Sequence, residues 1–145
     1  MLKKDIQEDL NKAVKENNEN TRSVLRMLLA AVINKEKELG KELEDLTAIV
    51  SSEAKKRKEA IKEYEKGGRI DLVDKEKAEL EVLSKYLPEQ LSEEEIKSLA
   101  EKAIKESDTK EIGKIMSVLM PEVKNKADGS EVNRIVKELL NDRDQ

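Results

Sequence analysis

The chain contains neither cysteine nor histidine. Without cysteine it has no disulfide, no thiolate zinc site and no cysteine nucleophile. Without histidine it has no Ser-His-Asp or Cys-His triad and no imidazole for acid–base catalysis or metal binding. Carboxylates and lysines are abundant, but no spacing marks any two of them as a catalytic pair. We therefore expect no catalytic residue, cofactor or metal ion, and no enzymatic activity of the chain on its own.

Aromatic side chains are almost absent, with two tyrosines and no phenylalanine or tryptophan among 145 residues. Any core must therefore be built from leucine, isoleucine, valine, alanine and methionine. Charged residues make up 43% of the chain and apolar residues 37%, a composition typical of helical hairpins and bundles that bury a narrow stripe. It also approaches the composition of disordered segments, but the regular apolar periodicity described below favours a folded protein.

Long hydrophobic runs and a positive net charge are also missing. No stretch approaches the roughly 20 apolar residues of a membrane span, and the first residues have no apolar targeting region. We expect a cytoplasmic protein that does not bind membranes. The net charge of −4 provides no global field for nucleic acid. Locally, residues 110–137 carry six basic and four acidic side chains, a small positive surplus.

The N-terminal third has the periodicity of two amphipathic helices. Four-residue steps predict a helix over residues 2–16 with Ile6, Leu10 and Val14 facing inward. Thr21 is the expected N-cap of the second helix. Residues 24–33 are apolar nearly all round, so we expect this part to lie buried between its neighbours. On its surface, Arg22 and Arg26 share one face and are expected either to contact phosphate or to pair with carboxylates of adjacent helices.

A long antiparallel helical hairpin is predicted next. Gly40 ends the second helix, and residues 47–66 form a seam of Val50, Ala54, Arg57, Ile61 and Tyr64. The short Gly67-Gly68 connection leads into a helix over 71–87, with Asp71 as its N-cap and Pro88 as its stop. A charged residue in the seam is unusual, so Arg57 is expected either to extend to solvent or to pair with Glu76 or Glu79.

The C-terminal third carries the sharpest local signal, the sequence Ser92-Glu93-Glu94-Glu95. Its spacing fits a capping box at the start of a helix over 92–106, which we favour over a metal-binding carboxylate cluster. Asp108 and Glu111 repeat the capping spacing before a second helix, which Pro121 is expected to end or bend. The segment from Asp128 opens a third helix.

These patterns predict an all-α protein in two parts. Residues 1–90 form an N-terminal helical hairpin domain, and residues 91–145 form a small three-helix domain.

Three segments resemble the GatB/YqeY family, in particular its free-standing YqeY-like proteins. They are LRMLLAAVINKE (25–36), KKRKEAIKEYEKGGRIDLVDKEKAELEVLSKYLPEQLSEEEI (55–96) and GKIMSVLMPEVKNKADG (113–129). The resemblance implies an all-α structure similar to the C-terminal tail of the B subunit of glutamine-dependent tRNA amidotransferase. In that subunit the tail grips the tRNA and performs no chemistry. Proteins of this family are often labelled as having carbon–nitrogen ligase activity with glutamine as amide donor. For this chain the resemblance implies that label only through homology to a non-catalytic region.

The resemblance points to a nucleic-acid site in the last segment, at Lys114, Lys124, Lys126 and Gly129, with Arg22 and Arg26 as further candidates. Family members usually have K-G-K-A-D-G where this chain has Asn125. Because asparagine tolerates the left-handed conformation better than most residues, the turn is expected to survive.

Several functional interpretations remain open at this point. The lysines contact phosphates of a structured RNA such as tRNA, or they belong to a solvated, capped loop. Alternatively, the chain is an accessory module that docks on an aminoacyl-tRNA synthetase or amidotransferase without contacting RNA, or a helical interaction protein with unrelated partners.

Overall fold

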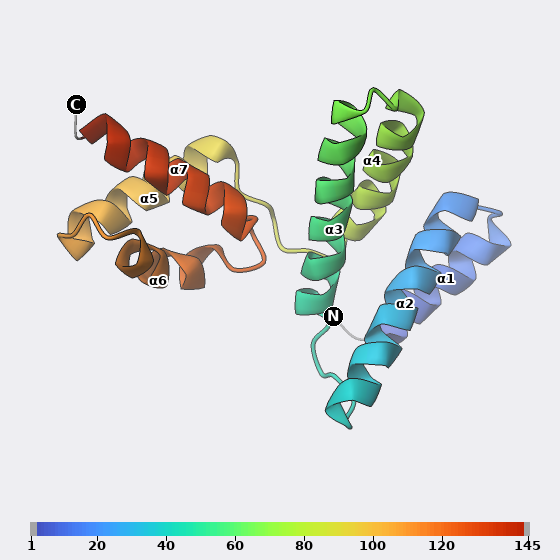
Figure 1. Cartoon of the computed structure of the whole chain (residues 1–145). Coiled ribbons are helices and arrows are strands. Elements are labelled where there is room, and N and C mark those ends of the chain that lie inside the picture. Colours follow the sequence, from blue (N-terminus) through green and yellow to red (C-terminus); the bar gives the residue numbers. More distant parts are fainter. Residues whose placement is uncertain (1–2, 144–145) are drawn as a thin grey trace. The chain divides into compact units, whose positions relative to one another are not determined.

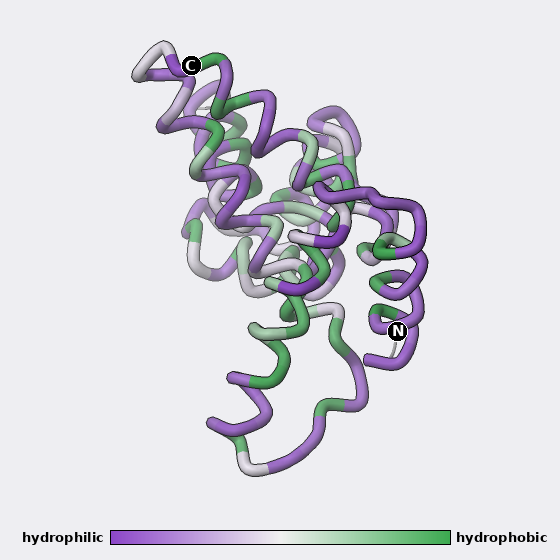
Figure 2. The backbone as a smooth tube through the Cα atoms, turned by 90° about the vertical axis from the view of Figure 1, so that its right-hand side faces the viewer, coloured by the Kyte–Doolittle hydropathy of each residue, from purple (hydrophilic) through white to green (hydrophobic). Residues whose placement is uncertain are grey.

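The computed structural model describes residues 3–143, and these form seven α helices and no strand (Figure 1). The all-α prediction is therefore confirmed for this range. The chain divides between Leu87 and Pro88 into two compact units, each with its own apolar core. Figure 2 shows apolar positions recurring along helices that are otherwise hydrophilic, as expected of narrow buried stripes.

The N-terminal unit contains four helices: α1 (Lys3–Lys15), α2 (Glu19–Leu39), α3 (Thr47–Lys66) and α4 (Ile70–Ser84). Helix α1 packs along α2, α3 packs along α4, and α2 also contacts both α3 and α4 (Figure 1). The largest fully buried side chains of its core are Ile6, Leu25, Leu28, Leu46 and Leu83. Helix α2 thus joins the two hairpins.

Two expectations for α1 and the start of α2 are wrong. Val14 is 42% exposed, and Ala13 is buried beside Ile6 and Leu10 instead. At 3.6 residues per turn, Val14 is rotated about 80° from Ile6 but Ala13 only about 20°. The N-cap of α2 is Asn18, whose side-chain oxygen accepts a hydrogen bond from the Thr21 amide at 3.2 Å.

The middle of α2 is buried on one side only, contrary to the expectation of burial all round. Val24, Leu25, Leu28, Leu29 and Val32 are buried. Met27 and Ile33, however, remain 49% and 45% exposed. The three neighbouring helices therefore leave one flank of α2 uncovered.

The α2–α3 connection is held by a carboxylate. Gly40 ends α2 as predicted; it adopts a left-handed φ of 71° and caps the helix by donating its amide to the Glu36 carbonyl at 2.8 Å. The Glu36 carboxylate binds the Lys3 ammonium at 2.7 Å and the Leu43 amide at 2.9 Å. These contacts, that of Lys3 foremost, lower the pKa of Glu36. One side chain thus ties the start of α1 to the end of α2.

The α3–α4 hairpin has the predicted connection but different bounds for α4. Helix α3 spans the predicted residues 47–66. Helix α4 begins at Ile70, so Asp71 lies in its first turn and binds the Arg69 side chain; its assignment as N-cap is wrong. The helix ends at Ser84, three residues before the predicted end. Beyond it the chain tightens into a turn, and the Tyr86 hydroxyl donates to Asp9 of α1 at 2.5 Å.

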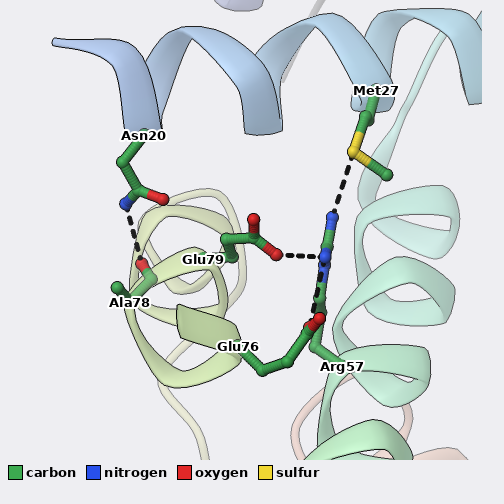
Figure 3. A network of polar contacts seen from close by, with 6 residues as sticks. All are labelled: Asn20, Met27, Arg57, Glu76, Ala78 and Glu79. Atoms are coloured by element: carbon green, nitrogen blue, oxygen red, sulfur yellow. Dashed lines mark hydrogen bonds and ion pairs between the residues drawn. The ribbon is translucent and has the colours of Figure 1, made fainter. Parts of the chain in front are cut away.

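A buried charge network joins α3 to α4 (Figure 3). The Arg57 guanidinium contacts Glu79 and lies 3.2 Å from Glu76. The Arg57 Nη1 atom makes both of these contacts, and its Nη2 atom lies 3.4 Å from the sulfur of Met27 on α2. Glu79 is only 5% exposed, the single charged residue buried in the described part of the chain. The predicted pairing of Arg57 is confirmed with both glutamates.

The C-terminal unit contains α5 (Glu93–Ser107), α6 (Ile112–Val123) and α7 (Gly129–Arg143) around a core of isoleucine, leucine, valine and alanine. The capping box is confirmed: the Ser92 hydroxyl accepts from the Glu95 amide, and the Glu95 carboxylate accepts from the Ser92 amide, both at 3.2 Å.

Two details of the α5–α6 region differ from expectation. Asp108 is the left-handed C-cap of α5, with φ of 49°, and does not cap α6. The Thr109 hydroxyl instead accepts a hydrogen bond from the Glu111 amide at 3.1 Å, just before α6. At Pro121, where α6 was expected to end or bend, the helix does not end and continues to Val123. Proline lacks the amide that would bond within the helix, but the buried Leu119 and Val123 hold the last turn to the core.

Candidate nucleic-acid interface

The lysine loop, residues 124–128, connects α6 to α7 and carries two of the predicted site residues. Asn125 adopts a left-handed φ of 64°, so the expected turn is formed with asparagine in place of glycine. The side chains on either side of it, Lys124 and Lys126, are exposed. Neither ammonium group has a carboxylate partner among the described residues. The loop therefore presents two uncompensated positive charges two residues apart.

The backbone carbonyls of this loop are bound to the segment that precedes α5. The Leu91 amide donates to the Lys126 carbonyl at 2.8 Å. The Gln90 side-chain amide donates to the Asn125 carbonyl at 2.9 Å and also to the Pro88 carbonyl at 2.9 Å. The partly negative oxygens of two successive loop residues are therefore engaged by donors of the same unit. Gln90 lies within the segment 55–96 that resembles the family, but nothing in the sequence indicates its contact with Asn125, which is visible only in the fold.

The start of α7, where Gly129 was a candidate, is already capped. The Asp128 carboxylate accepts a hydrogen bond from the Ser130 amide at 3.2 Å. A carboxylate in this position satisfies the amide and repels a second anion. A β-carbon at Gly129 would meet the Met120 methyl group at an ordinary 3.6 Å. Gly129 therefore has room for a β-carbon, and close packing does not require a glycine there.

Lys114 lies apart from the lysine loop. It is in the first turn of α6, ten residues from Lys124, which corresponds to about 15 Å along the helix. Its ammonium group pairs with the Glu111 carboxylate at 3.4 Å in an exposed position. The guanidinium of Arg134 binds Glu138 at 3.0 Å and Glu93 at 3.3 Å, and these contacts raise its pKa. Lys124 and Lys126, together with the exposed Lys137 on α7, therefore carry the positive surplus of this region.

The two arginine candidates belong to the N-terminal unit. Arg22 is half-buried and pairs with Glu19 of its own helix at 3.7 Å, so the expected pairing with an adjacent helix is wrong. Arg26 is exposed and has no ion pair with a described residue. Both arginines lie in the N-terminal unit, whereas the lysine loop belongs to the C-terminal unit.

The N-terminal unit also contains a groove that the sequence did not indicate. It lies between α2 and the first half of α3, with a volume of about 660 Å³. Its floor consists mainly of small or apolar side chains: Met27, Ala30, Ala31, Ala48, Ile49 and Ser52. Its rims carry two ion pairs, Lys35 with Glu38 and Lys56 with Glu53. The exposed flank of α2 noted above borders this groove.

Neither a metal site nor a membrane-spanning helix is found in the part of the chain that the structure describes. No three acidic side chains there are grouped so that they could hold a metal ion. None of the described helices is long and apolar enough to cross a bilayer.

Comparison with known proteins identifies the family of this chain. A family model described as Yqey-like protein matches residues 3–140. The chain belongs to this family. The match extends across both units and includes the lysine loop.

Curated relatives of this YqeY-like chain come from fungi. A protein of Pyrenophora tritici-repentis named altered inheritance of mitochondria protein 41, mitochondrial, is 30% identical over 93% of the chain and 78% of its own length. A protein of the same name from Lachancea thermotolerans is 34% identical over 57% of the chain and 46% of its own length. An uncharacterized protein of Schizosaccharomyces pombe is 38% identical over 33% of the chain and 39% of its own length. Matches to the last two therefore cover less than half of each relative.

Proposed function

We propose that this YqeY-like chain is a non-catalytic module that binds structured RNA, with tRNA as the class of ligand, through the lysine loop. The observation that carries the proposal is the pair of exposed ammonium groups at Lys124 and Lys126, which lack carboxylate partners among the described residues. Lysine side chains free of intramolecular partners are available to replace the counterions of a nucleic-acid backbone. Phosphate contacts of this kind recognise RNA by shape.

The choice of tRNA is supported by the resemblance of residues 113–129 to the tail of the amidotransferase B subunit. The lysine loop lies within that segment. In this proposal the chain holds the tRNA, and any carbon–nitrogen ligase activity belongs to a partner enzyme. The capped start of α7 leads us to assign phosphate contact to the lysines and not to the amides beside Gly129.

Mobility shifts with total tRNA test the proposal. We expect salt-sensitive binding at about 50 mM salt, a condition in which phosphate contacts are strong. Absence of a shifted complex at that salt concentration would exclude RNA binding by this chain.

A charge-matched pair of variants localises the site. Lys124→Gln/Lys126→Gln should weaken tRNA binding and reduce the slope of log K against log salt by about 0.7 to 0.9 for each lysine. The control is Lys97→Gln/Lys102→Gln, which removes the same charge from exposed positions of α5 in the same unit. Equal losses in both double variants would show that only net charge matters and would refute a site in the lysine loop.

The groove between α2 and α3 favours a second candidate function, docking of a helix from an aminoacyl-tRNA synthetase or amidotransferase. Its floor of small side chains permits close approach of a helix, and its neutral, paired rims suit a partner of mixed charge. Co-purification of such an enzyme with the wild-type chain, lost in Ala31→Glu but retained in Ala60→Glu, would support docking. Recovery of neither enzyme class, or equal recovery with both variants, would exclude it.

A further inference from the structure

Gln90 connects the segment between the two units to the lysine loop. Its side-chain amide donates two hydrogen bonds, one to the Pro88 carbonyl and one to the Asn125 carbonyl, each at 2.9 Å. Gln90 is half-buried in this position. One residue farther along, the Leu91 amide donates to the Lys126 carbonyl at 2.8 Å. Two successive carbonyls of the loop are thus held by two successive residues of the connecting segment.

These contacts determine which way the loop faces. After α6 the backbone leaves the helical conformation at Lys124, with ψ of 128°, and reverses at Asn125 in the left-handed region. Left-handed asparagine is tolerated but not preferred over other conformations, so the turn alone does not hold a single shape. With both carbonyls turned toward Gln90 and Leu91, the side chains of Lys124 and Lys126 remain at the surface. The loop is therefore ordered before any ligand arrives.

Preorganisation of this kind affects affinity without adding a contact to the ligand. A lysine pair on a loop of many conformations binds only from the fraction in the competent shape, and its apparent affinity falls by that fraction. Ordering such a loop during binding costs free energy that a preformed loop has already spent in folding. Residues that hold the loop are consequently as important for binding as the lysines themselves.

We infer that Gln90 is a positioning residue for RNA binding: it holds the lysine loop in the shape that presents Lys124 and Lys126 together to neighbouring phosphates of one strand. This inference rests on the proposed RNA-binding function. It assigns a role to a side chain that lies outside the loop and contacts no ligand. It also links binding to the segment that joins the two units, because any ligand that stabilises the loop must, by reciprocity, stabilise the hydrogen bonds of Gln90 and Leu91.

Two substitutions of Gln90 test the inference in the full-length chain. Gln90→Ala and Gln90→Met both remove the two donated hydrogen bonds without changing charge, and methionine keeps most of the side-chain volume. The control is Ser98→Ala, an exposed neutral change on α5 of the same unit. Tyrosine is absent from this unit, so correct folding is checked by circular dichroism and by amide hydrogen exchange of the core helices.

The measured quantities are amide exchange at Leu91 and tRNA affinity at several salt concentrations. Both Gln90 variants should accelerate exchange of the Leu91 amide and lower tRNA affinity by about tenfold, the size expected from losing one or two neutral hydrogen bonds. The salt slope should stay at the wild-type value, because no phosphate contact has been removed. Added tRNA should slow Leu91 exchange in the wild-type chain.

The outcomes distinguish a failure of the proposed RNA binding from a failure of the positioning role of Gln90. If the wild-type chain does not bind tRNA, the proposed function is wrong and the inference falls with it. If the wild-type chain binds and both Gln90 variants bind equally well, RNA binding stands and the positioning role of Gln90 is wrong. A loss of tRNA affinity in Ser98→Ala equal to that in the Gln90 variants would also overturn it, since Ser98→Ala leaves both hydrogen bonds of Gln90 in place.

Discussion

Arg57 should be essential to the stability of the N-terminal unit. Its side chain is only 12% exposed, and those of its partners Glu76 and Glu79 are 15% and 6% exposed. In the variant Arg57→Met, two carboxylates would remain between α3 and α4 without a counter-charge. Removing one partner of a buried ion pair typically costs about 3 to 5 kcal/mol. Methionine keeps the apolar stem that packs in the seam, so the loss measures mainly the missing charge.

The expected loss is large compared with the free energy of unfolding of a small domain, which is about 5 to 15 kcal/mol. For a unit of this size each kcal/mol lowers the melting temperature by about 4 to 8 °C, so we expect a decrease on the order of 12 to 40 °C. Because the C-terminal unit has its own core, a signal from both units would mix two unfolding transitions, so the assay must report the N-terminal unit alone. Both tyrosines, Tyr64 and Tyr86, belong to the N-terminal unit. Tyrosine fluorescence during urea unfolding is therefore a selective probe.

A matched control and a rescue complete the test. Lys66→Met removes one partner of an exposed pair with Glu63 on the same helix, with side chains 76% and 73% exposed, and should cost less than about 1 kcal/mol. The triple variant Arg57→Met/Glu76→Leu/Glu79→Leu should recover most of the stability lost in Arg57→Met, since apolar side chains can replace a buried ion network. A loss in Arg57→Met no greater than that in the control would refute the reasoning.

Three further predictions concern the caps, the loop and a tyrosine. Ser92→Ala should destabilise the C-terminal unit by about 1 kcal/mol in urea unfolding followed by circular dichroism, whereas Ser98→Ala, in the middle of the same helix, should not destabilise it. Asn125→Gly should preserve stability in the same assay and Asn125→Ala should lower it by about 1 kcal/mol, because only the latter is strained at positive φ; equal effects would argue against the left-handed turn. Burial, reinforced by the hydrogen bond to Asp9, raises the pKa of Tyr86 above its ordinary 10.0, so its contribution to stability is complete below about pH 10 and is lost as the pH rises further. Tyr86→Phe should therefore lose stability less steeply above about pH 10 than the wild type, in unfolding curves measured across that range, and parallel curves would contradict the assignment.

Local chemistry was predictable where neighbours in sequence determine the outcome. The capping box at Ser92, the end of α2 at Gly40 and the bounds of α3 depend on residues within one helical turn of each other. For Arg57 the sequence offered two alternatives, extension to solvent or pairing with Glu76 or Glu79, and the fold selected the pairing. The N-cap prediction for α2 failed because a second polar residue nearby could also act as the cap. Asn18 displaced Thr21 as a cap because its side chain reaches the Thr21 amide.

The candidate site was predictable only as a set of residue types. The sequence indicated Lys124 and Lys126 but could not separate them from Lys114, because the distance along a helix and the pairing with Glu111 appear only after folding. The exposure of Met27 and Ile33 was not predictable for a similar reason. A run of apolar residues does not indicate how many faces of the helix are covered by neighbouring helices. The contact of Gln90 with Asn125 had no signal in the sequence, since the two residues are 35 positions apart.

By itself, the sequence determined the helical class, the narrow aliphatic cores and the lack of thiol and imidazole chemistry, because periodicity and composition act through local conformational preference and burial. Only the tertiary structure decided which charges are compensated. It placed Arg57 between two carboxylates and left Lys124 and Lys126 without a described partner, because a charge is neutralised by what packs against it and not by what precedes it in the chain.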